Sequence, residues 1–175
     1  MGDTGRIWVD LHRTSAAKAI YANLPDYDEM RVWQRHLQPG DLFVDVGANV
    51  GTYSVLAASL GASVVAVEDT AALLRENIEL NGFNTVEVVQ AAAGAVPGSV
   101  RYTSGLDSVN RIDSTGAVEV EMVTLDQLIG SRTVAGLKVD VEGFELEVLK
   151  GATSALSRPR PQPPSVREGS RPTAK

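Results

Sequence analysis

Two acidic residues stand near the expected ends of buried strands, where an unpaired charge is costly. Asp45 lies near the end of the apolar run Leu42–Val46, and Glu68 ends a second run, Ser63–Glu68. The carboxyl ends of parallel strands meet at one edge of a sheet, so both carboxylates are expected to lie beside one ligand. Glu68 is suited to accept two hydrogen bonds from a ribose diol. The alternative for Glu68 is a contact with the start of the next helix, which Asp69 or Thr70 could make instead.

The residues after Asp45 form a turn that distinguishes dinucleotides from S-adenosylmethionine. The turn reads GANVG, in which glycines let the backbone approach a ligand, but it lacks the G-x-G-x-x-G spacing of dinucleotide sites. The Asp45 carboxylate would also repel a pyrophosphate, at a cost of about 1–4 kcal/mol at a few ångströms. S-adenosylmethionine has no phosphate, and its ammonium and sulfonium groups would be attracted. The turn therefore predicts S-adenosylmethionine as the ligand.

A second group of charges lies in GLKVDVEGFELEVLKGA, residues 136–152. Lys138, Asp140 and Glu142 alternate with apolar residues, so their side chains share one direction if the strand persists. Because burying unpaired charge is expensive, these groups must pair with one another or face a cleft. A site role is favoured over a purely structural Lys138–Asp140 ion pair. Two carboxylates two residues apart are too few to predict a metal site, so a divalent cation is considered without support.

The elements that position these residues alternate between short apolar runs and helical stretches. This pattern between Asp41 and Leu156 predicts an α/β fold with a doubly wound, mostly parallel sheet. The expected strands are Leu42–Val46, Ser63–Glu68, Thr85–Gln90 and Gly136–Val141. The expected helices are 27–37, 50–60, one that starts after Asp69 or Thr70 as N-cap and ends at Asn81-Gly82, and one after Gly143 with Phe144, Val148, Leu149 and Ala152 on its core face.

Residues 91–123 depart from this alternation. Two short extra strands are expected to flank the polar loop Ser104–Ser114, whose Ser108 and Asn110 are candidate substrate-binding residues. A plain surface loop is the more common explanation of such a segment. Thr124 is expected to cap a short helix that follows. Near the N-terminus, Ile7–Leu11 is an ambiguous strand.

Composition excludes several function classes. With 175 residues, 43% of them hydrophobic and none of them cysteine, we expect one soluble domain without disulfides or a thiolate metal site. No apolar run approaches the ~20 residues that span a bilayer, and no signal peptide is evident, so we expect a cytoplasmic protein without a membrane partner. The net charge of the chain is −6, and residues 157–175 contribute +4, so the remaining residues carry −10. Such an acidic domain argues against nucleic acid as a partner.

Two motifs, VDVGANVGTYSVLAA and TLDQL…LKVDVEGFELEVLKGA, together closely resemble the FkbM-type methyltransferase family, a branch of the class I S-adenosyl-L-methionine-dependent enzymes. The resemblance extends roughly over 27–156. It implies a Rossmann-like domain at 41–156 that transfers a methyl group to a hydroxyl of a small molecule, natural product or sugar. The cofactor-binding residues that it implies are Asp45, Gly47, Asn49, Gly51 and Glu68, and Ala48 and Asp69 are further candidates for cofactor binding. Asp140 and Glu142 are implied to face the methyl group and the acceptor as catalytic residues.

The chemistry of methyl transfer suits these residue types. Transfer is an in-line displacement at a sulfonium, so the enzyme mainly aligns the acceptor and excludes water. An alcohol is a poor nucleophile until its proton leaves, and a positioned carboxylate that takes this proton contributes on the order of 10²–10⁴-fold. Asp140 is the first choice for this base, and a divalent cation on Asp140 and Glu142 is the alternative.

The sequence departs from the family after Leu156. A class I domain continues there with further strands, whereas 157–175 are rich in Pro and Arg and are expected to be disordered. We therefore expect a domain that lacks the last strands of the family, with an exposed sheet edge through which a homo-oligomer could form. Residues 1–40 are expected to be an extension of helix and strand. Two functions stay open: an O-methyltransferase, and an inactive truncated remnant that binds S-adenosylmethionine.

Overall fold

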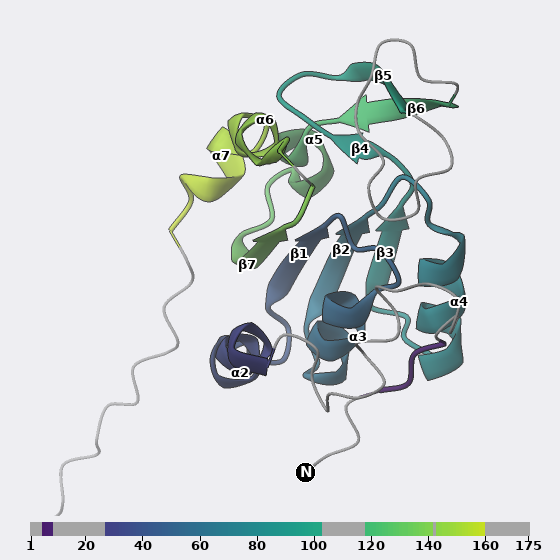
Figure 1. Cartoon of the computed structure of the whole chain (residues 1–175). Coiled ribbons are helices and arrows are strands. Elements are labelled where there is room, and N and C mark those ends of the chain that lie inside the picture. The colour runs from purple at the N-terminus through teal and green to yellow at the C-terminus, as the bar shows by residue number, and fades with distance from the viewer. Residues whose placement is uncertain (1–4, 9–26, 103–117, 142, 160–175) are drawn as a thin grey trace, which may run out of the picture.

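A four-stranded parallel sheet forms the centre of the molecule (Figure 1). The computed structural model describes residues 5–8, 27–102, 118–141 and 143–159. The strands of the sheet are β1 (Leu42–Val46), β2 (Ser63–Val67), β3 (Val86–Val89) and β7 (Val134–Val139). Their order is β3-β2-β1-β7, and every adjacent pair is parallel. This arrangement confirms the predicted Rossmann-like α/β fold and places the turn after β1 at the switch point where ligands bind.

The strand predictions are confirmed except for the bounds of β7. β1 has the predicted bounds, and β2 and β3 differ from the prediction by no more than one residue at each end. β7 begins and ends two residues earlier than predicted. It ends at Val139 because its partner β1 ends at Val46, which pairs with Val139. One further hydrogen bond joins Asp140 N–H to the Val46 carbonyl at 3.0 Å. Asp140 therefore lies just beyond the ladder, at the carboxyl-terminal edge of the sheet.

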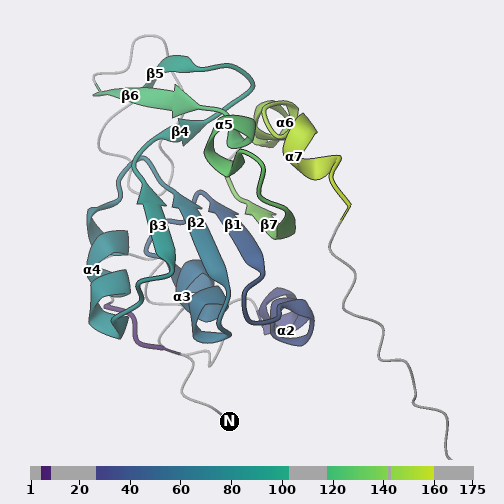
Figure 2. The ribbon, with the colours of Figure 1, turned by 180° about the vertical axis from the view of Figure 1, so that it is seen from behind.

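Helices cover both faces of the sheet (Figures 1 and 2). Alternate residues of β1 point to opposite faces. Phe43 belongs to a core shared with α2 (Tyr27–His36), α3 (Thr52–Ser59) and α4 (Ala72–Asn81). Val44 and Val46 belong to a second core shared with α5 (Leu125–Ile129), α6 (Glu145–Lys150) and α7 (Thr153–Leu156). The sheet is thus buried on both faces, as expected of parallel strands.

The start of α4 corrects one prediction. The residue that precedes the helix is Ala71, which has no side chain able to cap it, whereas Asp69 or Thr70 was predicted as the N-cap. Thr70 instead donates its backbone N–H to Glu68 Oε1 at 3.2 Å, within the turn before the helix. The predicted end is confirmed, because Gly82 has the left-handed conformation with φ of 66°.

The motif TLDQL begins α5 and joins it to α7. Thr124 caps α5 as predicted, and its hydroxyl accepts the Gln127 N–H at 3.2 Å in a capping box. The Asp126 carboxylate accepts the N–H groups of Ser154 and Ala155 at 3.0 and 2.7 Å, in the first turn of α7. Burial opposes this effect, but these two donors hold the pKa of Asp126 below its usual value of 3.8. The role of this motif is therefore structural.

A small second sheet stands above the carboxyl-terminal edge of the main sheet (Figure 1). It contains β4 (Ala92–Ala93), β5 (Gly98–Tyr102) and β6 (Val118–Val123) in the order β4-β6-β5. β5 and β6 pair in antiparallel fashion and confirm the two extra strands predicted around the polar loop. The loop itself, Ser104–Ser114, lies outside the described residues.

The outer side of β7 and α6 is uncovered in the part of the chain that the structure describes. β7 is the last strand of the sheet on that side. Leu146, Leu149 and Leu156 are 64%, 42% and 46% exposed. The prediction that Leu149 belongs to the core was therefore wrong, whereas Val148 and Ala152 are fully buried as predicted. The leucines are exposed because no described element packs over them.

The short segment Gly5–Trp8 contacts α4. Arg6 N–H donates to Asn81 Oδ1, and Trp8 N–H donates to Asn77 Oδ1, both at 2.6 Å. This segment has no regular secondary structure, so the first two residues of the strand predicted at Ile7–Leu11 are not in a strand. The remainder of that prediction lies outside the described residues.

Candidate functional site

The turn between β1 and α3 has conformations that require small residues. Gly47, Asn49 and Gly51 have positive φ angles of 69°, 51° and 90°. A Cβ on Gly47 would lie 2.0 Å from the backbone oxygen of Asp140, so only glycine lets this turn pack against the end of β7. Gly47 is therefore required by a contact within the protein, in addition to any approach of a ligand.

The backbone N–H groups of this turn bond within the protein. Gly47 and Ala48 both donate to the last carbonyl of β2, at 2.9 and 3.1 Å, and Gly51 donates to Ala48 at 2.8 Å. Asn49 N–H donates to Glu68 Oε2 at 2.8 Å. A phosphate-binding turn presents free N–H groups to its anion. These four groups are occupied, so the turn disfavours a pyrophosphate for a reason that does not depend on side-chain charge.

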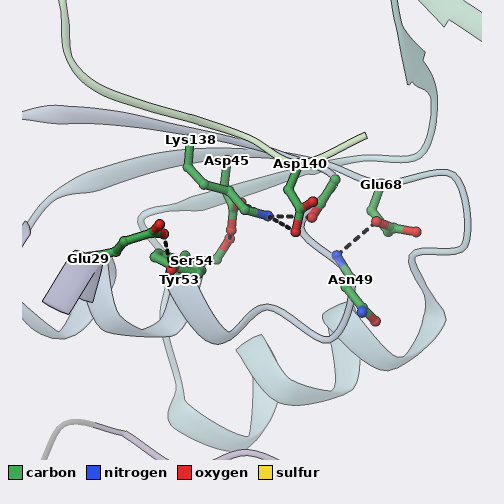
Figure 3. Close-up of polar contacts among 9 residues, drawn as sticks. Glu29, Asp45, Asn49, Tyr53, Ser54, Glu68, Lys138 and Asp140 are labelled. Carbon is green, nitrogen blue, oxygen red and sulfur yellow. Dashed lines mark hydrogen bonds and ion pairs between the residues drawn. The ribbon is translucent and has the colours of Figure 1, made fainter. Parts of the chain in front are cut away.

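Asp45 is fully buried below the turn. Its Oδ2 accepts the Ser54 hydroxyl at 2.7 Å, and its Oδ1 lies 3.2 Å from Lys138 Nζ (Figure 3). Oδ1 forms this close ion pair without hydrogen-bond geometry. The expectation that the Asp45 carboxylate is open to a cationic ligand is therefore corrected, because Lys138 and Ser54 compensate its charge inside the protein. Any effect of Asp45 on a ligand therefore passes through Lys138 and the turn.

Lys138 joins β7 to the turn. Its Nζ donates to the Gly47 carbonyl at 2.6 Å and lies 3.9 Å from Asp140 Oδ2. It also lies 5.4 Å from the centre of the Tyr53 ring, within the range of a cation–π contact. The side chain is only 13% exposed. The Lys138–Asp140 pair that the sequence offered as an alternative is present, but it is longer than the contact with Asp45.

Glu68 directly follows β2 and lies beside the turn (Figure 3). Its two oxygens accept the N–H groups of Asn49 at 2.8 Å and Thr70 at 3.2 Å. Burial, followed by a hydrogen bond with Asp69, raises the pKa of Glu68 from 4.5 to about 7, and the two N–H donors oppose this rise. Each oxygen keeps a lone pair for a ligand. Glu68 thus contacts the start of the next helix, as in the alternative interpretation, and still has acceptor capacity.

The other predicted site residues differ in position. Asp69 is half-buried beside Glu68 and accepts the Thr70 hydroxyl at 3.1 Å. Asp140 is exposed over 73% of its side chain at the edge of the sheet, close to the turn. The predicted residues Glu142, Ser108 and Asn110 lie outside the described residues.

Neither a metal centre nor a membrane span is found in the part of the chain that the structure describes. There, no group of three or more His, Asp or Glu side chains is arranged to hold a metal ion. Among these same residues, no helix combines the length and apolar character needed to cross a bilayer.

A family model described as the methyltransferase FkbM domain matches residues 45–170. The chain belongs to the FkbM methyltransferase family. The matched segment begins at Asp45 and includes the glycine turn, Glu68, Lys138 and Asp140. The family that the two motifs resemble is thereby confirmed.

Two curated relatives and one solved structure are similar to this FkbM domain. A hexuronic acid methyltransferase, AglP, from Haloferax volcanii is 31% identical over 140 residues, which are 75% of this chain and 58% of the relative. An uncharacterized protein, MJ1452, from Methanocaldococcus jannaschii is 30% identical over 80 residues, 42% of this chain and 31% of the relative. The solved structure is a putative methyltransferase from an antibiotic biosynthesis pathway of Anabaena variabilis, with 27% identity, a TM-score of 0.33, and coverage of 39% of this chain and 28% of that one. The chain therefore spans less than two thirds of each of these proteins.

Two residues of the FkbM domain, Ser54 and Asn77, support the site but were not identified from the sequence. Ser54 and Lys138 hold Asp45, and the fully buried Asn77 donates its Nδ2 to the Val50 carbonyl in the turn at 2.8 Å. Ser54 and Asn77 are polar residues at core positions of α3 and α4. That position is the signal that identifies them, because a buried polar group needs a specific partner.

Proposed function

We propose that this protein is an S-adenosylmethionine-dependent O-methyltransferase that acts on a hydroxyl of a small molecule, natural product or sugar. The observation that carries the proposal is the hydrogen bond from Asn49 N–H to Glu68 Oε2, which holds a carboxylate beside the turn at the switch point. Membership of the FkbM methyltransferase family supports the same reaction. The proposal keeps the cytoplasmic location that the sequence predicts.

The described residues fit S-adenosylmethionine better than a dinucleotide. The backbone N–H groups of Gly47, Ala48, Asn49 and Gly51 are all bonded within the protein, so these residues do not favour a phosphate. Glu68 would accept hydrogen bonds from the ribose diol, with Asp69 beside it. Exposed Asp140 adds negative charge at the same edge, which favours a cationic ligand. When bound, S-adenosylmethionine supplies an electrophilic methyl group on a positively charged sulfur.

Asp140 is the proposed proton acceptor. Its carboxylate is exposed at the carboxyl-terminal edge of the sheet, where it is accessible to an acceptor molecule. It would take the proton of the acceptor hydroxyl and so raise the nucleophilicity of the oxygen, worth on the order of 10²–10⁴-fold. Glu142 stays a second candidate from the sequence.

The relative from Haloferax volcanii favours sugar acids as the first acceptors to test, because it is named for a hexuronic acid. A hexuronic acid has both hydroxyl and carboxylate oxygens. A hydroxyl needs a base, whereas a carboxylate is already ionised at neutral pH. Asp140→Asn therefore separates the two targets: it should lower transfer to a hydroxyl on the order of 10²-fold or more and change transfer to a carboxylate little.

Isothermal titration calorimetry with S-adenosylmethionine and S-adenosylhomocysteine tests cofactor binding. Glu68→Ala should weaken binding about tenfold or more, because it removes the acceptor proposed for the ribose diol. Glu76→Ala on the exposed face of α4 is the matched control and should bind like the wild type. Absence of binding to protein shown to be folded would refute the proposal.

A labelled-methyl transfer assay with uronic acids, neutral glycosides and phenols tests the reaction itself. Transfer to a hydroxyl, lost in Asp140→Asn, is expected. The second candidate function is cofactor binding without transfer, which is favoured by the outer edge of β7, where none of the described strands pairs with it. Binding together with no transfer to any acceptor would support this candidate and contradict the enzymatic proposal.

A further inference from the structure

The ammonium group of Lys138 lies between the two halves of the candidate site. It contacts the turn after β1 through the Gly47 carbonyl, at 2.6 Å, and the buried Asp45 carboxylate, at 3.2 Å (Figure 3). On its other side, Asp140 Oδ2 lies 3.9 Å away. One side chain on β7 therefore contacts both the turn proposed to hold the cofactor and the carboxylate proposed to take the proton.

The surroundings restrict where this ammonium can lie. Tyr53 places its ring 5.4 Å from Nζ, and the Tyr53 hydroxyl donates to Glu29 Oε2 on α2 at 2.9 Å. Ser54, the next residue of α3, holds the other oxygen of Asp45 at 2.7 Å. Lys138 is 13% exposed, so most of its donors must bond inside the protein. The ammonium is thus fixed by α3 and β1 as well as by its own strand.

Balancing the charge of Asp45 does not by itself require the contact with Gly47. A buried carboxylate needs a cation nearby, and the Asp45 contact meets this need. The shortest bond of Lys138 nevertheless goes to the Gly47 carbonyl, within the turn. The same peptide region packs against the Asp140 backbone, where a Cβ on Gly47 would not fit.

We propose that Lys138 is a positioning residue for methyl transfer, which holds the turn after β1 and the Asp140 carboxylate in one fixed arrangement. This inference rests on the proposed function for its catalytic meaning. Lys138 donates to the turn, neutralises Asp45 and attracts Asp140, so a cofactor on the turn and an acceptor at Asp140 are aligned by a single group. Alignment of this kind matters because small displacements of reacting groups cost large factors in rate.

The test compares three variants. Lys138→Met alone leaves the Asp45 charge buried without a partner and is expected to destabilise the fold strongly. The double variant Asp45→Asn with Lys138→Met removes both charges and keeps the fold testable. Lys138→Arg retains a cation that can donate to the same acceptors. Lys150→Met is the matched control, since Lys150 is exposed on α6 and pairs only with Glu147 among the contacts described for it.

The first measurement uses the ligand-free protein. Amide hydrogen exchange followed by NMR should show exchange at Asn49 and Asp140 about tenfold or more faster in the double variant, while amides in β2 keep their protection. Lys138→Arg should exchange slowly at both amides, as the wild type does, and Lys150→Met should also resemble the wild type. Unchanged exchange at Asn49 and Asp140 in the double variant would overturn the inference.

The second measurement is the affinity for S-adenosylhomocysteine, with the thermal midpoint measured on the same samples. The double variant should bind about tenfold or more weakly although it is folded, and Lys138→Arg should recover the affinity. A double variant that loses thermal stability but keeps wild-type affinity would show a purely structural role and refute positioning. If the wild type itself does not bind the ligand, the proposed function fails, and the exchange measurement alone decides whether Lys138 positions the turn.

Discussion

The raised pKa of Glu68 predicts that stability decreases as the pH rises through the neutral range. Burial raises this pKa from 4.5 to about 7, so the folded state holds a proton between these values that the unfolded chain has released. The folded state binds more protons in this window, and the free energy of unfolding therefore falls with rising pH. The full stabilisation is present below pH 4.5 and is lost as the pH passes 7. The shift corresponds to about 3 kcal/mol between these limits.

Urea unfolding of the wild type and Glu68→Gln at intervals from pH 4.5 to 8 measures this effect. Glutamine offers one oxygen for the N–H groups of Asn49 and Thr70, so at pH 4.5 the variant should be less stable than the wild type by about 1 kcal/mol. This deficit should shrink and then reverse as the pH rises to 8, because only the wild type loses stability through Glu68. A constant difference across the range would refute the raised pKa.

The same group predicts proton release on cofactor binding. A ribose diol donates its hydrogen bonds to the ionised carboxylate, so binding should displace the proton from Glu68. At pH 6.5 about three-quarters of a proton should be released per ligand, given a pKa of about 7. Calorimetric titration of S-adenosylhomocysteine in buffers of different ionisation enthalpy measures this number, and Glu68→Gln should reduce it to near zero. Equal proton release by both proteins would contradict the assignment of Glu68 to the ligand.

Three further predictions concern the turn, the last helix and the open sheet edge. Gly47→Ala should lower the free energy of unfolding by about 2–5 kcal/mol, because it combines a positive φ with a clash against the Asp140 backbone. The control Gly82→Ala has a positive φ but open space around the new Cβ, so it should cost only about 1–2 kcal/mol. Equal costs in denaturant unfolding would contradict the packing of Gly47 against Asp140. Asp126→Ala should lower stability by about 1 kcal/mol at pH 7, because it removes the acceptor of two N–H groups in α7. Because the pKa of Asp126 is lowered, the stabilisation by its carboxylate should be present above about pH 4 and lost in acid. If the variant and the wild type lose stability equally in acid, this role of Asp126 is refuted. We also propose that two copies associate through the edge of β7 that no described strand covers and through the exposed leucines of α6, since a two-fold axis lets one edge strand pair with itself. Light scattering should show a dimer that Leu149→Glu dissociates, and a monomeric wild type would exclude this association.

Much of the fold was predictable because local pattern and long-range packing agree. The apolar run of β1 was placed with its observed bounds, and Gly82 ends α4 where a left-handed cap was expected. Thr124 was placed correctly because its capping box depends on residues close in sequence. Predictions that depended on distant partners were less accurate. β7 ends early because β1 ends, and Leu149 is exposed because nothing described covers it.

The candidate site was likewise predictable in part. The sequence alone determined that carboxylates and a glycine turn meet at one edge of a parallel sheet, because residue type and strand direction suffice for that inference. Only the tertiary structure decided what each group bonds to. In the folded chain Asp45 is buried against Lys138, which lies 93 residues later in the sequence, and the Asn49 N–H donates to Glu68. The spacing of residues along the chain contains no information about these contacts, because a side chain's partners are set by the packing of β1, α3 and β7 in space.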